Sequence, residues 1–437
     1  MYKRNNKIKS LICASMVGAM LNSFGVQVLA TTTMDENTRS FAENLEEVNL
    51  DVLMENTKAV SYTKAIGYGE KAIGGENTAV KVFEVRTRDE LKNALSAKVL
   101  DPSTGKTSVT APRVIVLMND INLCVDSRGK EFIPGVSSTK DMIWTSGSDM
   151  AKDVILKVNS NTTILGKYEN ESGEGRTIYG GGLKLSSGTD NVIIKHINFA
   201  DAYDFFPEWD GSEWNTELDN LTLEGATNVW IDHCTFSDGD NVEVAEDCKD
   251  INQPIYHDGL LDIKKGSDLV TISNCVFENH KKAILIGHSD SASSTDAKKL
   301  RVTFTNNYFN NIKERMPRVR YGNIHSFNNY YTSDSNHSIG YVYGMGINST
   351  VYSEDNIFDL SKGSIYKSMN SGTATYFYEE CGSILNGKLV GSSTYGATKP
   401  AYTTSAKPSY KYTSIDVTES NYNSVKNSII SNAGHKN

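Results

Sequence analysis

An eight-residue pattern that recurs six times constrains the fold of this chain more than any other feature. Each copy begins with a β-branched residue, carries His, Asn or Asp at its fifth position and ends with an aromatic residue. A constant octet at variable spacing predicts stacked coils with insertions between them. The copies start at Val192, Val229, Val270, Val302, Ile324 and Val351.

The octets predict β-strands and argue against helical repeats, because no helical stripe of apolar residues lies between the copies. We expect an all-β fold, a right-handed parallel β-helix, with the handedness following from the crossover rule for parallel strands. Stacking would align the eighth-position rings in a column at about the 4.8 Å strand spacing. It would also let the fifth-position polar side chains form a hydrogen-bonded ladder at a turn. The fifth-position residues are His196, His233, Asn274, Asn306, Asn328 and Asp355.

Short helices and long loops are expected around the solenoid. The capping box Thr87-x-x-Glu90 predicts a helix over residues 88–97 that covers one open end. Apolar spacing predicts a second helix within 419–432, ended by Gly434. The long insertions at 200–228 and 237–256 are expected to project from one side and to form the walls of a groove.

The first 64 residues precede the predicted β-helix domain, which we place at residues 65–437. Residues 1–30 indicate a secretory signal peptide, because four cations precede an apolar stretch from Leu11 to Leu29 and Val28-Leu29-Ala30 is a suitable cleavage site. A transmembrane anchor is the alternative, but polar residues interrupt the stretch. The acidic residues 31–64 are typical of a linker or pro-segment. We therefore expect a secreted protein without a membrane span.

Five cysteines remain once Cys13 leaves with the signal peptide. An odd number means that at least one thiol is free, and no Cys-x-x-Cys suggests zinc. Cys234 and Cys275 occupy the same octet position on neighbouring coils. They form either a disulfide or a stack of buried thiols.

Three aspartates are candidates for a metal site. Asp258 and Asp262 would lie about 13 Å apart in an extended strand, so Gly259 must bend the chain to bring both onto one ion. Asp232 is expected one rung away, on the preceding coil. Carboxylate oxygens suit a hard divalent ion, and Ca²⁺ is the typical one. The alternative is three separately solvated aspartates.

Separated cations follow these aspartates. They are Lys282 and the arginines Arg315, Arg318 and Arg320. The chain has a formal net charge of −9, so a site for a polyanion must be local and cationic or bridged by metal. Arg and Lys suit the carboxylates of an acidic ligand, although a solvated charge run paired with Glu314 is the simpler alternative. This pattern predicts an enzyme that holds an acidic sugar polymer between metal and cations, with neither nucleic acid nor membrane as partner.

Several longer motifs follow one another along the chain. They are Val229-Trp-Ile-Asp-His233, Asp258-Gly-Leu-Leu-Asp262-Ile-Lys-Lys-Gly-Ser-Asp268, Val270-Thr-Ile-Ser-Asn274, Leu285-Ile-Gly-His-Ser-Asp290 and Glu314-Arg-Met-Pro-Arg-Val-Arg-Tyr-Gly322. Together they resemble the bacterial pectate lyases of polysaccharide lyase family 1, from about residue 85 to 360. The resemblance implies calcium at Asp232, Asp258 and Asp262, and a catalytic base at Arg315. It implies that Lys282 and Arg320 hold substrate carboxylates, and we add Arg318 to this group.

The activity implied is calcium-dependent β-elimination of polygalacturonate to 4,5-unsaturated oligogalacturonides by a monomer. One departure is Lys281, where the family commonly has an acid before the lysine. A hydroxide base with Arg315 only stabilising charge is an alternative mechanism. Alternative functions are a pectin lyase acting on methyl esters, a hydrolase with paired carboxylates, and a non-catalytic β-helix protein that binds polysaccharide.

Overall fold

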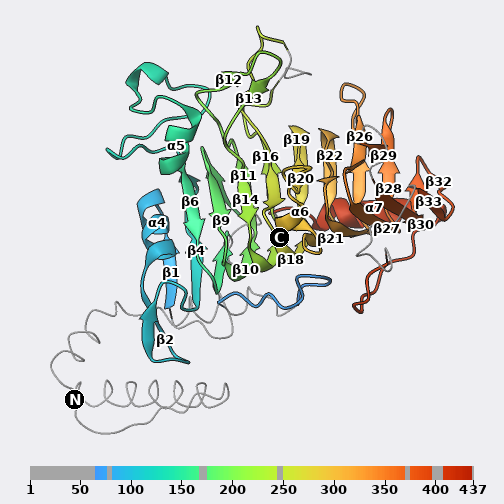
Figure 1. Ribbon diagram of the computed structural model, residues 1–437, viewed down its shortest axis with the longest axis horizontal. Coiled ribbons are helices and arrows are strands. Elements are labelled where there is room, and N and C mark those ends of the chain that lie inside the picture. Colours follow the sequence, from blue (N-terminus) through green and yellow to red (C-terminus); the bar gives the residue numbers. More distant parts are fainter. Residues whose placement is uncertain are drawn as a thin grey trace, which may run out of the picture. The chain divides into compact units, whose positions relative to one another are not determined.

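Three β-sheets of 11, 10 and 8 strands form the walls of a β-helix in the computed structural model (Figure 1). The structure describes residues 64–75, 81–166, 175–243, 250–369, 375–395 and 407–435. These residues all belong to the unit Glu55–Asn437. The predicted signal peptide (1–30) and the linker up to residue 63 lie outside the described residues. The predicted all-β parallel β-helix is confirmed.

Successive coils each add a strand to the sheets, and neighbouring strands are parallel except for the pairs β30–β33 and β31–β32. The 11-stranded sheet contains β1 (Lys81–Val85), β4 (Arg113–Leu117), β7 (Thr162–Leu165), β10 (Asp190–Lys195), β15 (Thr227–Asp232), β18 (Asp268–Ser273), β21 (Arg301–Thr305), β24 (Asn323–Phe327), β27 (Ser349–Glu354), β30 (Tyr376–Cys381) and β33 (Ser393–Tyr395). The 10-stranded sheet contains β5 (Ile121–Asn122), β8 (Arg176–Tyr179), β11 (Ile197–Ala200), β16 (Thr235–Ser237), β19 (Val276–Lys282), β22 (Tyr308–Glu314), β25 (Tyr330–Thr332), β28 (Ile357–Asp359), β31 (Ile384–Leu385) and β32 (Lys388–Leu389). The 8-stranded sheet contains β6 (Ile155–Val158), β9 (Gly182–Leu185), β14 (Leu221–Glu224), β17 (Leu261–Lys264), β20 (Ile284–Ile286), β23 (Arg318–Val319), β26 (Tyr341–Met345) and β29 (Ser364–Ser368).

The register between coils confirms the octet pattern. The six octet starts pair with one another in sequence order along the 11-stranded sheet. The eighth-position rings form a buried column in which neighbouring centroids lie 4.7–5.0 Å apart, as expected for one ring per strand. The rings belong to Phe199, Phe236, Phe277, Phe309, Tyr331 and Phe358.

The polar ladder lies one octet position later than predicted. All six fifth-position residues have φ between 49° and 56° and turn the chain from the first sheet to the second, a conformation that Asn, Asp and His tolerate better than most residues. The sixth position carries the buried ladder: Asn307 Nδ2 donates to Asn329 Oδ1 at 2.9 Å, and Asn329 Nδ2 donates to Asn356 Oδ1 at 3.0 Å. Cys234 and Cys275 occupy this level on earlier coils as buried free thiols, so the disulfide alternative is wrong.

The two predicted helices are present. In α4 (Arg88–Ser96) the Thr87 side chain accepts a hydrogen bond from Glu90 N, and the apolar face packs into the core beside the first strands. Helix α7 (Tyr422–Asn432) covers the outer side of the 10-stranded sheet, because Val425 and Ile429 pack with Ile357 of β28. Both helices therefore shield strand surfaces that water would otherwise contact.

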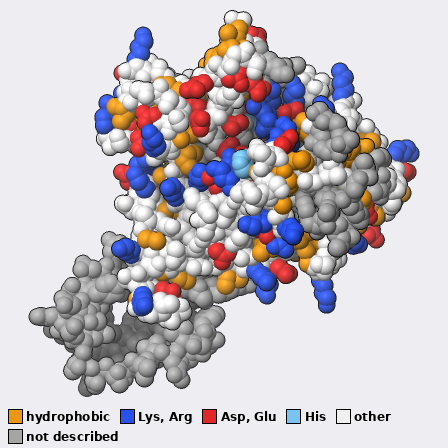
Figure 2. All heavy atoms as spheres, in the orientation of Figure 1, with side chains coloured by type: hydrophobic (Ala, Val, Ile, Leu, Met, Phe, Trp, Pro, Cys, Tyr) orange, Lys and Arg blue, Asp and Glu red, His pale blue; other side chains and the backbone are white. Residues whose placement is uncertain are grey.

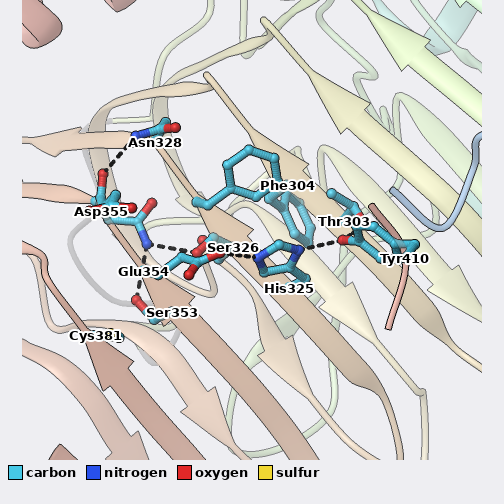
Figure 3. A network of polar contacts seen from close by, with 12 residues as sticks. Thr303, Phe304, His325, Ser326, Asn328, Ser353, Glu354, Asp355, Cys381 and Tyr410 are labelled. Carbon is cyan, nitrogen blue, oxygen red and sulfur yellow. Dashed lines mark hydrogen bonds and ion pairs between the residues drawn. The ribbon is translucent and has the colours of Figure 1, made fainter. Parts of the chain in front are cut away.

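Segments from both ends of the described chain cover the outer face of the 11-stranded sheet. Gly69 N donates to Thr271 Oγ1 at 2.9 Å, and a Cβ on Gly69 would lie 2.7 Å from the Thr271 backbone nitrogen. From the other end, the Tyr410 hydroxyl bonds to His325, whose Nε2 lies 2.9 Å from Glu354 Oε1 (Figure 3). These contacts show that both segments are hydrogen-bonded to side chains of the 11-stranded sheet.

Long loops between the second and third sheets form a satellite core on one side. They run from 201 to 220 and from 238 to 260, with residues 244–249 outside the described residues. The first predicted insertion, 200–228, was too long, because its last part forms β14 and the start of β15. Trp144 and Met150 of the α5 region (Gly147–Val154) pack with Phe205 and Leu218 of the first loop. This packing fixes the end of the loop immediately before β14. The smaller elements are β2 (Val99–Asp101), β3 (Lys106–Ser108), η1 (Thr139–Asp141), β12 (Glu208–Trp209), β13 (Trp214–Asn215) and α6 (Ser293–Asp296).

Candidate functional site

Two buried aspartates from neighbouring coils meet where β14 and β17 begin. Asp219 follows the buried Leu218 and precedes β14, whereas Asp262 lies within β17. Asp219 Oδ1 accepts a hydrogen bond from Gly259 N at 3.1 Å, and its Oδ2 accepts one from Thr222 at 2.9 Å. These bonds direct the Asp219 carboxylate toward the bend at Gly259, which precedes β17. Thr222 and Asp262 are register partners, so both aspartates belong to one place on the 8-stranded sheet.

Burial and like charge make this pair electrostatically costly. Burial, and then the Asp262 and Asp258 carboxylates, raise the pKa of Asp219 well above its ordinary value. Burial likewise raises the pKa of Asp262, with a further contribution from Asp258 and opposition from the Lys264 ammonium. Asp258 is half-buried and gives the cluster a solvent-facing side. Three neighbouring carboxylates of this kind need a cation to remain ionised together.

The structure does not bring Asp232 to this cluster. Asp232 ends β15 in the 11-stranded sheet, and its register partner on the next coil is Ser273. Its carboxylate accepts hydrogen bonds from Ser273 Oγ at 2.6 Å and Asn274 Nδ2 at 2.9 Å, and the His233 ring lies 2.8 Å away. Burial opposes its ionisation, but the contact with His233 and the other bonds outweigh burial and lower the pKa of Asp232. The expected position of Asp232, one rung from Asp258 and Asp262, is therefore wrong.

Sequence reasoning missed Asp219 because the octet describes only the first two sheets. A second, weaker repeat would have found it. Leu221-Thr-Leu-Glu224 and Leu261-Asp-Ile-Lys264 are successive strands of the third sheet and pair residue by residue. When these two segments are aligned as one repeat, Leu221 matches Leu261 and Asp219 matches Gly259. Asp219 is thereby placed beside the bend that precedes β17.

Cations follow the aspartates along the same face of the 8-stranded sheet. Asp262 pairs with Leu285 and Leu285 with Arg318, so Arg318 lies two strand spacings, about 10 Å, from Asp262. Lys264 and Arg320 follow two residues later and share that face. Figure 2 shows Lys and Arg side chains gathered beside Asp and Glu side chains in a hollow, in the region where Figure 1 labels β19 and β22.

Arg315 occupies the turn that leads from β22 toward β23. Its φ is 64°, a left-handed conformation that an arginine seldom adopts. The Arg315 carbonyl accepts a hydrogen bond from Ile284 N at 2.8 Å, which fixes the turn against β20. Its side chain is only 19% exposed, and its charge favours the ionised form of Asp262. The Arg315 guanidinium therefore lies close enough to interact with the carboxylate cluster.

The other predicted cations lie around Arg315. Arg320 Nε donates to Asp290 Oδ1 at 2.6 Å and Arg320 Nη1 to the Gly287 carbonyl at 3.1 Å. Lys282 ends β19 and is half-buried, with Glu314 as its register partner on β22. Burial, and then the charges of Arg320 and Arg315, lower the pKa of Arg318. Crowded cations of this kind favour an anionic ligand.

A buried network of histidines and acids supports the backbone at Asp258. His280 Nε2 lies 2.9 Å from the Asp258 carbonyl, and His280 Nδ1 lies 2.6 Å from Asp238 Oδ1. His257 Nδ1 lies 3.2 Å from Glu243 Oε1. Burial opposes a charge on His257, but Asp238 and the hydrogen-bonded acids outweigh it and raise the pKa of His257 to about 10. A charged His257 thus links the start of the second loop, at Asp238 and Glu243, to its end beside Asp258.

The chemistry of the cluster fits a hard cation, although its geometry is not that of a completed site. Among the described residues, there is no group of three or more Asp, Glu, His or Cys side chains arranged closely enough to hold a metal ion. Asp219 and Asp262 nevertheless face one point, because a Cβ on Gly259 would lie 2.9 Å from Asp219 Oδ1 and 3.0 Å from Asp262 Oδ1. Glycine keeps this space open. Calcium takes carbonyl and water oxygens as well as carboxylates, so the donor types fit it.

Comparison with known proteins identifies the family. A sequence model of the family described as "Pectate lyase" matches residues 42–437. The chain belongs to the pectate lyase family. Pectate lyase D of Dickeya chrysanthemi is 36% identical over 378 residues, which cover 83% of this chain and 85% of that protein. The pectate lyase of Bacillus subtilis (strain 168) is 32% identical over 357 residues, covering 73% and 80%.

Solved structures agree with this assignment. A structure titled as pectate lyase bound to hexasaccharide superimposes with a TM-score of 0.67 at 29% identity, covering 85% of this chain and 97% of that one. The pectate lyase of Acidovorax avenae subsp. citrulli gives a TM-score of 0.68 at 26% identity, with coverage of 86% and 95%. The protein is therefore an enzyme of the pectate lyase family. Among the helices described, none has the length and apolar character needed to cross a membrane.

Asn substitutions at Asp219 and Asp232 distinguish the two candidate aspartates. The pKa of Asp219 is higher in the folded chain than in the unfolded chain, so ionised Asp219 lowers the free energy of unfolding at neutral pH without metal. We expect Asp219→Asn to raise the Tm in chelator. Calcium should raise the Tm of the unmodified protein and leave that of Asp219→Asn unchanged. We expect Asp232→Asn to lower the Tm, since the pKa of Asp232 is lowered by folding, and to keep the calcium response. Differential scanning fluorimetry measures both; the opposite pattern would restore Asp232 as the ligand.

Proposed function

We propose that this enzyme cleaves polygalacturonate by calcium-dependent β-elimination and releases 4,5-unsaturated oligogalacturonides. One observation carries the proposal: a carboxylate cluster and a group of arginines lie on the same face of the 8-stranded sheet, separated by a single coil. That spacing of about 10 Å leaves room for the carboxylate of an acidic sugar between anionic and cationic sides. A hydrolase would need only an acid and a base flanking the bond.

Asp219, Asp258 and Asp262 are the residues that would hold the ion, and Asp219 takes the place first expected for Asp232. Bound calcium supplies positive charge that offsets the sugar carboxylate and the charge that develops beside it. Asp219 and Asp262 are buried and fixed by hydrogen bonds and strand register, whereas Asp258 faces solvent. The pair therefore orients the site, and Asp258 completes it on the side that substrate approaches.

Arg315 acts at the C5 carbon of the sugar. The C5 proton is adjacent to the C6 carboxylate, so removing it creates negative charge that nearby cations stabilise. Arg315 takes this proton while its guanidine is neutral and becomes a guanidinium. The C5 electron pair then forms the C4–C5 double bond, and the C4 oxygen leaves and takes up a proton from solvent, with no water added across the bond. The left-handed turn at Arg315 is hydrogen-bonded to β20, and the guanidinium acts on Asp262 of the cluster, which suits a group that must act at one atom.

Lys282, Arg318 and Arg320 hold the carboxylates of neighbouring sugars. Arg and Lys pair with carboxylates through charge-assisted hydrogen bonds. Lys281, the departure from the family pattern, lines a hollow of about 390 Å³ together with His280 and Lys313, and none of the three substrate-binding cations lines that hollow. We infer that the chain is secreted and acts as a monomer, with residues 1–30 as the signal peptide.

An ultraviolet assay tests the reaction class. Polygalacturonate mixed with the enzyme should gain absorbance from the unsaturated product in calcium and none in chelator. Chain shortening without this absorbance would indicate a hydrolase. Binding without shortening would indicate a non-catalytic polysaccharide-binding protein. Unchanged activity in chelator would overturn the calcium-dependent mechanism.

Two arginine variants test the roles within the site. We expect Arg315→Lys to lower kcat by orders of magnitude while calcium binding is kept, because the group that takes the proton is displaced. We expect Arg320→Ala to raise KM with a smaller effect on kcat, since it removes a charge-assisted contact of about 1.5–3 kcal/mol. Steady-state kinetics on polygalacturonate measure both.

A matched control is Arg86→Lys, the same chemical change at a side chain that is 49% exposed and pairs with Glu84. Its kcat and KM should match those of the unmodified enzyme. Small and equal losses in Arg315→Lys and Arg320→Ala would contradict the roles assigned to them.

A further inference from the structure

A lysine already occupies the edge of the carboxylate cluster. Lys264 Nζ lies 2.9 Å from Asp262 Oδ2 and 3.5 Å from Asp219 Oδ2, so one ammonium contacts both buried aspartates. Its side chain is 19% exposed. Asp262 and Lys264 are two residues apart in β17 and therefore point to the same side of the sheet. The strand itself sets this contact.

The acidic register partner of Lys264 on the neighbouring strand is already paired with other lysines. Glu224 is the register partner of Lys264 on β14. Its carboxylate instead pairs with Lys184 at 3.0 Å and with Lys265 at 3.0 Å. With Glu224 held by two other lysines, the Lys264 ammonium turns to Asp262 and Asp219. The contact is therefore specific to the buried pair and is not a general surface ion pair.

We propose that the Lys264 ammonium is a built-in counter-cation of the Asp219–Asp262 pair and that it competes with calcium for these carboxylates. The inference rests on the calcium site of the proposed function. A divalent ion bound to Asp262 Oδ2 at 2.3–2.6 Å would lie at most about 5.5 Å from the ammonium, given the 2.9 Å contact. The ion must therefore displace Lys264 or bind against its repulsion.

Two consequences follow from this competition. Without metal, Lys264 offsets the repulsion between the aspartates, so the site stays folded while it is empty of calcium. With metal, part of the binding free energy is lost to the displaced or repelled ammonium, so the affinity for free calcium is lowered. The same residue thus sets both the metal-free stability and the calcium concentration at which the site fills.

Lys264→Met tests the proposal, because it keeps the length and apolar stem of the side chain and removes only its charge. Calcium titrated into the metal-free protein by isothermal calorimetry, with no substrate, should bind about tenfold more tightly or better, as expected when a like charge within a few ångströms is removed. In chelator the Tm should fall. Lys264→Arg, which keeps the charge, should retain an affinity near that of the unmodified protein.

The control is Lys265→Met, which removes the same charge at the next residue. The Lys265 side chain is 51% exposed and pairs with Glu224. Its calcium affinity should be unchanged. The role of Lys264 would be overturned if Lys264→Met bound calcium no more tightly than the unmodified protein. It would also be overturned if Lys265→Met gained calcium affinity to the same extent as Lys264→Met. Absence of any calcium binding to the unmodified protein would instead overturn the proposed calcium site. If Lys264→Met does not fold, Lys264→Gln replaces it with the same expected tightening.

Discussion

Parallel register between successive coils is the constraint on which the rest of this structure depends. A side chain in a β-helix has its neighbours at the same level of the coils before and after it, whatever the length of loop between them. This rule stacks the eighth-position rings at 4.7–5.0 Å and continues the asparagine ladder through the core. It also places Asp262, Leu285 and Arg318 in one row. The site is thus a product of register, since its residues are remote in sequence.

Charge compensation shapes the site once register has assembled it. Parallel stacking puts acids beside acids and cations beside cations, which is unfavourable when the groups are buried. The cluster formed by Asp219 and Asp262 is balanced from within the chain by Lys264. Burial, and then the neighbouring Arg320 and Arg315, lower the pKa of Arg318. Both halves are therefore prepared for ligands of opposite charge, a divalent cation on one side and a carboxylate on the other.

The sequence was sufficient for the fold but not for the whole site. The octet predicted strand register and the aromatic column, because both follow from periodicity alone. It placed the polar ladder one residue early, since a left-handed turn such as that at Asn328 and an inward amide such as Asn329 look alike in sequence. The motifs also assign the third metal ligand to Asp232, and nothing in the sequence analysis predicts Asp219. The octet carries no information on the third sheet, where Asp219 and Asp262 meet after a loop whose path is set by tertiary packing.

The central claim is that Asp219, Asp258 and Asp262 hold one divalent ion opposite Arg315. The most direct test is a crystal structure of the full chain soaked in calcium, with the ion located by its anomalous signal. The account predicts one ion with oxygen atoms of Asp219 and Asp262 at about 2.3–2.6 Å and Asp258 beside it. An ion bound at Asp232, or full calcium occupancy elsewhere with this cluster empty, would contradict it.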